Sequence, residues 1–196
     1  MPEVPCRAVK KIGDRGPVIV VSGPPGSGKS TYARLLSRDF CLDYLTTGSI
    51  FRRLASELGV TLEELSRRAA RDPSIDLSID KATVEAARRG GVVIDSHLAA
   101  WVLSGVADVS ILVTAPLYVR VKRIASREGR DPWSVLEETV VREETQWSRF
   151  HSYYGYDASR PPQVDLVLDT SVLSVEQAYR VVKTLVEEKL EALGYL

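Results

Sequence analysis

The sequence predicts an α/β protein with a five-stranded parallel sheet between two layers of helices. Three observations lead to this fold class. Short apolar runs at 18–21, 92–94 and 109–113 alternate with longer segments of helical composition. The runs are apolar apart from Ser110, which is typical of parallel strands buried on both faces. A glycine-rich loop with the spacing G-x-x-x-x-G-K-S, from Gly23 to Ser30, joins the first run to a helix.

The expected elements follow an irregular leader over residues 1–16. Strands are expected at 17–22, 42–45, 92–95, 109–113 and 165–168, and helices at 30–40, 50–58, 61–70, 76–89, from 116, 132–154 and 174–193. Ser49 is the predicted N-cap of 50–58, and Thr61 with Glu64 has the spacing of a capping box. Ser174 is the predicted cap of the final helix, and Gly194 is its stop signal.

Composition excludes several classes of protein. The 196 residues suggest one domain, and the formal charge of zero argues against a general nucleic-acid binder. The apolar runs are far too short to span a membrane, and residues 1–6 lack the apolar core of a signal peptide. We therefore expect a soluble cytoplasmic protein.

Residue types that are rare in this chain lead to two further expectations, one about its source and one about its cysteines. The chain has no asparagine, three glutamines and one methionine, and arginine greatly outnumbers lysine, which indicates a thermophilic source. Cys6 and Cys41 are too few for a disulfide framework and lack zinc-ligand spacing. The favoured interpretation of Cys41 is packing in the core.

The glycine loop is predicted to bind a nucleoside triphosphate. Its glycines let backbone N–H groups point at one spot, and the following helix adds the positive end of its dipole. Lys29 can reach a terminal phosphate, and the Ser30 hydroxyl can bind Mg²⁺. The alternative, a glycine turn that binds nothing, does not explain the flanking strand and helix. The candidate ATP ligands are Gly23, Pro24, Pro25, Gly26, Ser27, Gly28, Lys29, Ser30 and Thr31.

Other polar groups follow the remaining strands, at the edge where ligands bind in an open α/β sheet. Thr47, Gly48 and Arg52 follow the second strand. Asp95 ends the third, where a carboxylate can hold a water on Mg²⁺, and His97 comes just after it. A capping or surface carboxylate is the alternative for Asp95.

Arginines recur on two of the expected helices. One series has helical spacing and a second pair lies seven residues apart; they are Arg120, Arg123, Arg127 and Arg130, then Arg142 and Arg149. Like charge on one face favours an anionic partner, such as a transferring phosphoryl group. We favour this interpretation for Arg120, Arg142 and Arg149, and a solvated, ion-paired surface for Arg130.

Taken together, these segments resemble the archaeal-type (type 2) cytidylate kinases, within the nucleoside monophosphate kinases. The resemblance rests on ordered motifs over about 17–190, namely residues 23–31, 47–52, 72–76 with 79–80, 98–101, 115–117 with Arg120 and Arg123, 142–144, 154–157 and 168–171. The first motif is specific for triphosphate binding only, and the order of the others carries the assignment.

The resemblance implies phosphoryl transfer from ATP to CMP, and to dCMP as well, with Mg²⁺ and no nucleic-acid partner. It implies a P-loop core (about 17–45, 91–130 and 160–196), a monophosphate-binding insert (46–90) and a mobile lid (131–158), in a monomer. Lys29, Arg142 and Arg149 would be catalytic, Arg120 would lie against ATP, and Ser30 and Asp95 would serve the metal. The implied acceptor ligands are Thr47, Gly48, Arg52, Asp76 and His97.

The chain departs from this family pattern in two places. His97 stands where many relatives carry an arginine that would contact the acceptor phosphate, so His97 or Arg53 would have to replace it. Trp147 stands where a basic lid residue is expected. Alternatives are a kinase of other acceptor preference, UMP or AMP, and an NTP-binding regulatory module, which would not need Arg52, Arg120, Arg142 and Arg149 together.

Overall fold

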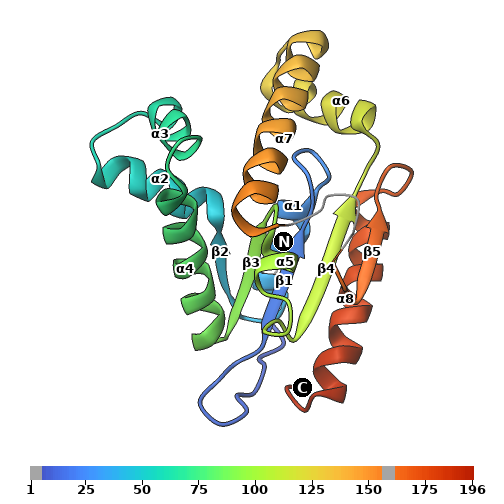
Figure 1. Ribbon diagram of the computed structural model, residues 1–196. Helices are drawn as coiled ribbons and strands as arrows, with labels where there is room; N and C mark the ends of the chain where they lie inside the picture. The colour runs from blue at the N-terminus through green and yellow to red at the C-terminus, as the bar shows by residue number, and fades with distance from the viewer. Residues whose placement is uncertain (1–5, 156–161) are drawn as a thin grey trace.

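The computed structural model describes residues 6–155 and 162–196. Within these ranges the chain forms a parallel sheet of five strands in the order β2-β3-β1-β4-β5 (Figure 1). Along the chain the elements are β1 (Val18–Ser22), α1 (Lys29–Asp39), β2 (Asp43–Thr46), α2 (Thr47–Glu57), α3 (Leu62–Ala69), α4 (Pro73–Arg89), β3 (Val92–Ser96), α5 (Ala99–Val102), β4 (Val109–Thr114), α6 (Leu117–Glu128), α7 (Pro132–Tyr154), β5 (Leu166–Asp169) and α8 (Val175–Ala192). The predicted fold class is confirmed. The start of the leader, the end of the expected lid and the 156–157 part of one motif lie outside the described residues.

The sheet is buried on both faces, as its apolar strands require. Alternate residues of β1 point to opposite sides: Ile19 and Val21 join a core with α1 and α8, whereas Val18 and Val20 pack with residues of α4 and α5. All five residues of β1 are buried, so the strand that leads into the glycine loop runs through the middle of the molecule. A three-layer arrangement results.

β1 lies between β3 and β4, and the chain passes from β1 to β2 and β3 on one side of it and then to β4 and β5 on the other. Ligands of open α/β sheets bind at such a switch point, beyond the carboxyl ends of the strands. In Figure 1, α2, α3 and α4 rise on one side of this edge and α7 on the other.

Two helices begin earlier than predicted because their capping residues, Thr46 and Asp72, lie nearer to the amino terminus. Thr46 ends β2 in an extended conformation, and its Oγ1 accepts a hydrogen bond from Gly48 N at 3.2 Å, so α2 begins at Thr47. Ser49 is not the cap, and its hydroxyl donates to the Thr46 carbonyl at 2.6 Å. Asp72 caps α4 through Ser74 N at 2.9 Å, and Pro73 fits the first helical position.

The predicted caps of α3 and α8 are present, but the capping box forms at α8 and not at α3. Thr61 caps α3 through Glu64 N at 3.1 Å, but the Glu64 carboxylate pairs with the arginines of the next turn at 2.9 Å. The reciprocal capping box forms instead at α8, between Ser174 and Gln177. The sequence analysis missed α5, because its four residues are too few to show a helical period.

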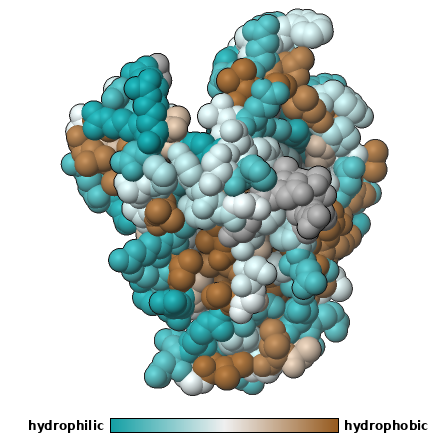
Figure 2. Space-filling view, viewed as in Figure 1, coloured by the Kyte–Doolittle hydropathy of each residue, from teal (hydrophilic) through white to brown (hydrophobic). Residues whose placement is uncertain are grey.

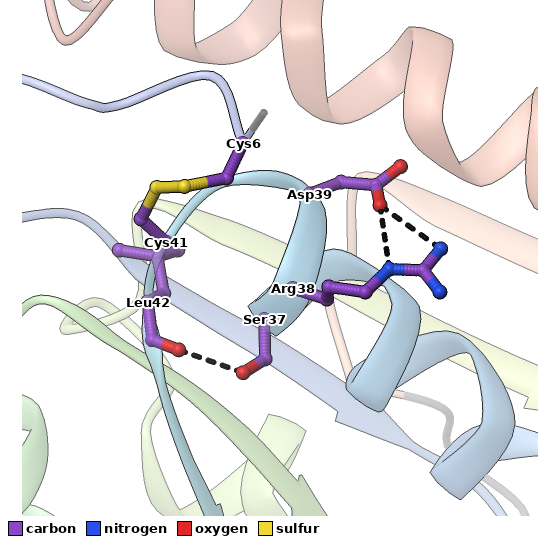
Figure 3. Close-up of a disulfide and its surroundings, with 6 residues drawn as sticks. All are labelled: Cys6, Ser37, Arg38, Asp39, Cys41 and Leu42. Carbon is purple, nitrogen blue, oxygen red and sulfur yellow. Dashed lines mark hydrogen bonds and ion pairs between the residues drawn. A yellow bond between two sulfur atoms is a disulfide. The ribbon is translucent and has the colours of Figure 1, made fainter. Parts of the chain in front are cut away.

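The interpretation of Cys41 as a core residue is wrong. Cys41 lies at the surface and forms a disulfide with Cys6, with the two Cα atoms 5.6 Å apart (Figure 3). The bond ties the leader to the turn after α1, where Arg7 N also donates to the Asp39 carbonyl at 2.8 Å. Two cysteines are too few for a disulfide framework, but they can form a single disulfide. The spacing of the two cysteines in the sequence does not predict this bond.

We predict that the Cys6→Ser variant loses roughly 2–4 kcal/mol of unfolding free energy, because the disulfide closes a long loop and so restricts the unfolded chain. Thermal unfolding with and without reductant measures this. Reductant should lower the Tm of the parent to that of the variant and leave the variant unchanged. An equal Tm for the oxidised parent and the variant contradicts the prediction.

None of the helices among the described residues combines the length and apolar character needed to cross a lipid bilayer.

Candidate functional site

A cavity of about 740 Å³ opens at the carboxyl edge of the sheet. Figure 2 shows this face hollowed at the top, between the lobe of α2–α4 and α7. The polar lining includes Lys29, Ser30, Thr47, Gly48, Arg52, Asp76, Asp80, Asp95, Ser96, His97, Arg142, Gln146 and Arg149. Its volume is in the range of small-ligand sites. The topology thus brings together predicted residues from five separate parts of the chain.

The glycine loop lies so close to neighbouring backbone that two of its glycine positions have no room for a side chain. A Cβ on Gly23 would stand 2.1 Å from the Val113 carbonyl oxygen, and one on Gly26 would stand 2.7 Å from the Arg120 carbonyl oxygen. Both glycines have positive φ, at 144° and 79°. The loop is therefore fixed against β4 and α6, with its N–H groups at the start of α1.

We predict that Gly26→Ala disrupts nucleotide binding, because the new methyl group forces the loop away from α6. ATP affinity should fall at least tenfold, the change expected from losing a charge-assisted phosphate contact worth about 1.5–3 kcal/mol. Gly129→Ala is the matched control, since Gly129 has a φ of 64° and nothing within 4 Å of its added Cβ. Similar ATP affinities for the two variants, measured by calorimetry, would contradict the prediction.

Lys29 and Asp95 form the electrostatic centre of the cavity. Burial lowers the pKa of Lys29, the Asp95 carboxylate opposes this, and Arg142 adds to it. Tyr44 donates its hydroxyl proton to Asp95 Oδ2 at 2.7 Å. The other carboxylate oxygen of Asp95 is buried without a hydrogen-bond partner. A buried oxygen of this kind, beside a lysine and Ser30, suits a hydrated cation.

Arg120 lies behind the loop rather than along the cavity. Its guanidinium donates to the Pro25 carbonyl at 3.2 Å and the Ala115 carbonyl at 3.0 Å, and it pairs with Glu143 of α7. With only 8% of its side chain exposed, its donors are used within the protein. Arg120 thus supports the loop.

Arg123 has a similar position that the sequence did not reveal. It donates to Thr170 Oγ1 at 2.9 Å and to the Thr170 carbonyl at 2.7 Å, and the Thr170 hydroxyl donates to the Ser27 carbonyl at 2.9 Å. The chain after β5 is thereby fastened to the glycine loop. Arg130, in contrast, pairs with Glu128 and Glu138 at the surface, as expected for it.

The two arginines of α7 enter the cavity opposite Lys29. Arg149 Nε lies 3.6 Å from Asp76 Oδ2 of α4, and neither atom has a hydrogen-bond partner. Burial raises the pKa of Asp76, and the charge of Arg149 acts against this. Burial also raises the pKa of Asp80, one turn further along α4. Arg149 Nε and one carboxylate oxygen of Asp76 therefore offer unsatisfied polar atoms to a ligand, whereas Asp80 has a hydrogen bond with Tyr154.

Arg52 of α2 lines the cavity together with Gly48. The two residues are close, since a Cβ added to Gly48 would lie 3.4 Å from Arg52 Nη1. The next arginine, Arg53, has a side chain 67% exposed and lies 3.6 Å from Glu57 on the outer side of the helix. Arg53 therefore cannot replace a missing phosphate ligand inside the cavity, and that expectation is wrong.

His97 lines the cavity but carries no charge at neutral pH. Burial lowers its pKa to about 4, a hydrogen bond with Gln146 opposes this, and the positive charges of Lys29 and Arg142 add to it. The ring contacts Trp147 edge-on, with centroids 5.5 Å apart. These contacts join the end of β3 to α7.

Most predicted residues meet in this one place, with exceptions. Of the loop residues, Pro25, Lys29 and Ser30 line the cavity, whereas Gly23, Pro24, Gly26, Ser27, Gly28 and Thr31 contribute backbone or lie beyond it. Sequence reasoning missed Tyr44 and Gln146, whereas Asp80 belongs to the motif at 72–76 with 79–80, where the resemblance implies a carboxylate that reads cytosine. Tyr44 lies in a short strand, for which the sequence favours apolar packing. The one signal for Gln146 is that it is one of only three glutamines in the chain.

Comparison with known proteins agrees with this geometry. Residues 19–143 match the family model described as an AAA domain. A protein from Staphylothermus marinus named cytidylate kinase is 49% identical over 89% of this chain and 98% of its own length. One of the same name from Aeropyrum pernix is 54% identical over 83% and 95%. The archaeal source of these relatives fits the expected thermophilic origin.

Solved structures support the fold alone. The chain superimposes on TT1252 from Thermus thermophilus with a TM-score of 0.60 at 22% identity, covering 89% of this chain and 98% of the other. A shikimate kinase from Bacteroides thetaiotaomicron gives 0.59 at 12% identity, covering 87% and 98%.

Proposed function

This chain belongs to the cytidylate kinase family, and from that premise we propose that it transfers the γ-phosphoryl group of ATP to CMP, giving ADP and CDP. We extend the proposal to dCMP as a second acceptor. The observation that carries it is the cavity itself, whose lining includes the lysine of the glycine loop, Arg52 and two carboxylates of α4.

Phosphoryl transfer needs positioning and charge neutralisation more than covalent chemistry. Lys29 lies at the amino end of α1, where it can bind the phosphoryl group in transit. Arg142 and Arg149 approach from α7, so positive charge surrounds the group on two sides. A helix that covers the site also excludes water, the competing acceptor.

The acceptor would lie between α2 and α4. Arg52 can bind its phosphate, and Thr47 and Gly48 can border it. The exocyclic amine of cytosine is a hydrogen-bond donor, so it needs an acceptor such as a carboxylate. Asp76 supplies an unsatisfied buried oxygen in the cavity, with Asp80 beside it. We assign base recognition to Asp76.

The cavity residues suit Mg²⁺ bound with ATP. No cluster of three acidic, histidine or cysteine side chains exists among the described residues. Mg²⁺ commonly binds through few carboxylates, waters and substrate phosphates, so the Ser30 hydroxyl and the unpartnered oxygen of Asp95 suffice. When bound, the ion supplies positive charge to the phosphate oxygens.

We further propose the division into a core, an insert (46–90) and a mobile lid (131–158). The position of α2–α4 and α7 on either side of the cavity supports this division (Figure 1). We expect a cytoplasmic monomer that acts on free nucleotides and not on nucleic acid, in line with the balanced charge.

The test is the dependence of ADP formation on the acceptor. The protein is incubated with Mg-ATP and, separately, CMP, dCMP, UMP, AMP and GMP. We expect the highest kcat/KM with CMP or dCMP. A preference for UMP, whose base lacks the exocyclic amine, would refute the role of Asp76, and a preference for AMP would refute CMP as the acceptor. ADP release independent of acceptor would indicate an NTP-binding module that is not a kinase.

A further inference from the structure

A cluster of five side chains joins α7 to the end of β3, and we call it the clasp: His97, Trp101, Gln146, Trp147 and Phe150. The Nδ1 of His97 lies 2.9 Å from Gln146 Oε1. Because an amide oxygen only accepts, Nδ1 is the donor. The His97 and Trp147 rings meet edge to face at 82°, and Trp101 meets Trp147 at 75° with centroids 5.5 Å apart.

The clasp supports the part of α7 that carries the cavity arginines. Arg142, Gln146 and Arg149 are spaced by four and three residues, so they lie along one face of the helix. The amino-terminal half of α7 is attached elsewhere, where Val135 packs against Ile124 and its neighbours in α6. The rest of α7 meets the protein through the clasp and through four further contacts. These are the Arg120–Glu143 ion pair, the Arg149–Asp76 contact, a hydrogen bond between Tyr154 and Asp80, and a hydrogen bond from the Tyr153 hydroxyl to the Ala69 carbonyl at 3.4 Å.

Trp147 is central to the clasp, yet it is not among the side chains that line the cavity. It lies between His97 and Trp101, one helical turn or less from both Arg149 and Gln146. Its effect on chemistry must therefore pass through the position of α7.

We propose that His97 is a positioning residue, which acts with Trp147 to dock α7 and so to set where Arg142 and Arg149 enter the cavity. This assignment rests on the proposed phosphoryl transfer, and it differs from the role of acceptor-phosphate ligand that the resemblance implies for His97. An arginine displaced by about 1 Å is enough to cost up to a hundredfold in rate.

The experiment uses the full chain with Trp133, which is 75% exposed, replaced by phenylalanine. The remaining two indoles are then the Trp101–Trp147 pair. Two indoles at this distance and inclination couple excitonically, which gives a circular dichroism couplet that reports on docking without any substrate. Four variants are compared on this background: His97→Ala, His97→Asn, Trp147→Leu and, as a control on the exposed side of the same turn, Ser148→Ala.

We expect His97→Ala to weaken the couplet and lower kcat at least tenfold, on the scale of arginine misplacement. Trp147→Leu should lower kcat similarly with little change in acceptor KM. His97→Asn keeps a donor near the Nδ1 position and should recover part of both signals. Ser148→Ala should match the background in both.

The proposal would be overturned if His97→Ala left the couplet unchanged and raised the acceptor KM while Trp147→Leu kept a normal kcat. These results would make His97 a ligand of the acceptor. The couplet needs no acceptor. Absence of acceptor-dependent ADP formation in the parent would therefore refute the proposed function, while a weakened couplet in His97→Ala would still support docking by His97.

Discussion

Replacing Lys29 with methionine should lower kcat for phosphoryl transfer by about a thousandfold, roughly 4 kcal/mol of transition-state stabilisation. Methionine keeps most of the side-chain length and removes the charge. The carboxylate of Asp95 favours this charge, and the positive charges of Arg142, Arg127 and Arg120 oppose it. Rates of ADP formation at saturating ATP and acceptor measure the effect.

Lys122→Met is the control, because Lys122 is an exposed lysine of α6 outside the cavity. Its kcat should match that of the parent. Unfolding curves for both variants show whether the fold is intact. A folded Lys29→Met protein that retains more than a tenth of the parental kcat would remove Lys29 from the catalytic machinery.

The second large effect is expected for Arg52→Ala. This variant should raise the acceptor KM at least tenfold, since a charge-assisted hydrogen bond to phosphate is worth about 1.5–3 kcal/mol. The KM for ATP should change far less, because ATP is expected at the glycine loop. Initial rates over a matrix of both substrate concentrations separate the two constants.

The neighbouring arginine gives a matched control. Arg53→Ala removes the same charge from the same helix, but Arg53 lies near Glu57 on the outer side. Its acceptor KM should stay within about twofold of the parent, as is usual for an exposed ion pair. Equal KM values for the two variants would mean that a general field, and not a contact from Arg52, attracts the acceptor.

The fold could be predicted because its signals are local. Apolar strands, a glycine loop and helix caps each occupy a few adjacent residues, and their order defines a parallel sheet. The same locality placed the cavity, since the carboxyl ends of parallel strands meet at one edge. The spacing of the glycine loop identified Lys29, and the rule for strand ends identified Arg52 and Asp95 as candidates.

What failed depends on contacts between distant segments. The Cys6–Cys41 disulfide needs the leader to return to the end of α1, which no spacing in the sequence reveals. The sequence did not reveal that Arg120, which the resemblance places against ATP, pairs with Glu143 of another helix. His97 could be judged only once Gln146 and Trp147 were seen beside it.

The most direct test of the central claim follows the phosphoryl group itself. The protein is incubated with ATP labelled in the γ-phosphate, Mg²⁺ and CMP, and the labelled products are separated. The account predicts label in the β-phosphate of CDP, with one CDP formed for each ADP and no CDP in the Lys29→Met variant. Label found in inorganic phosphate, at a rate that does not depend on CMP, would contradict it.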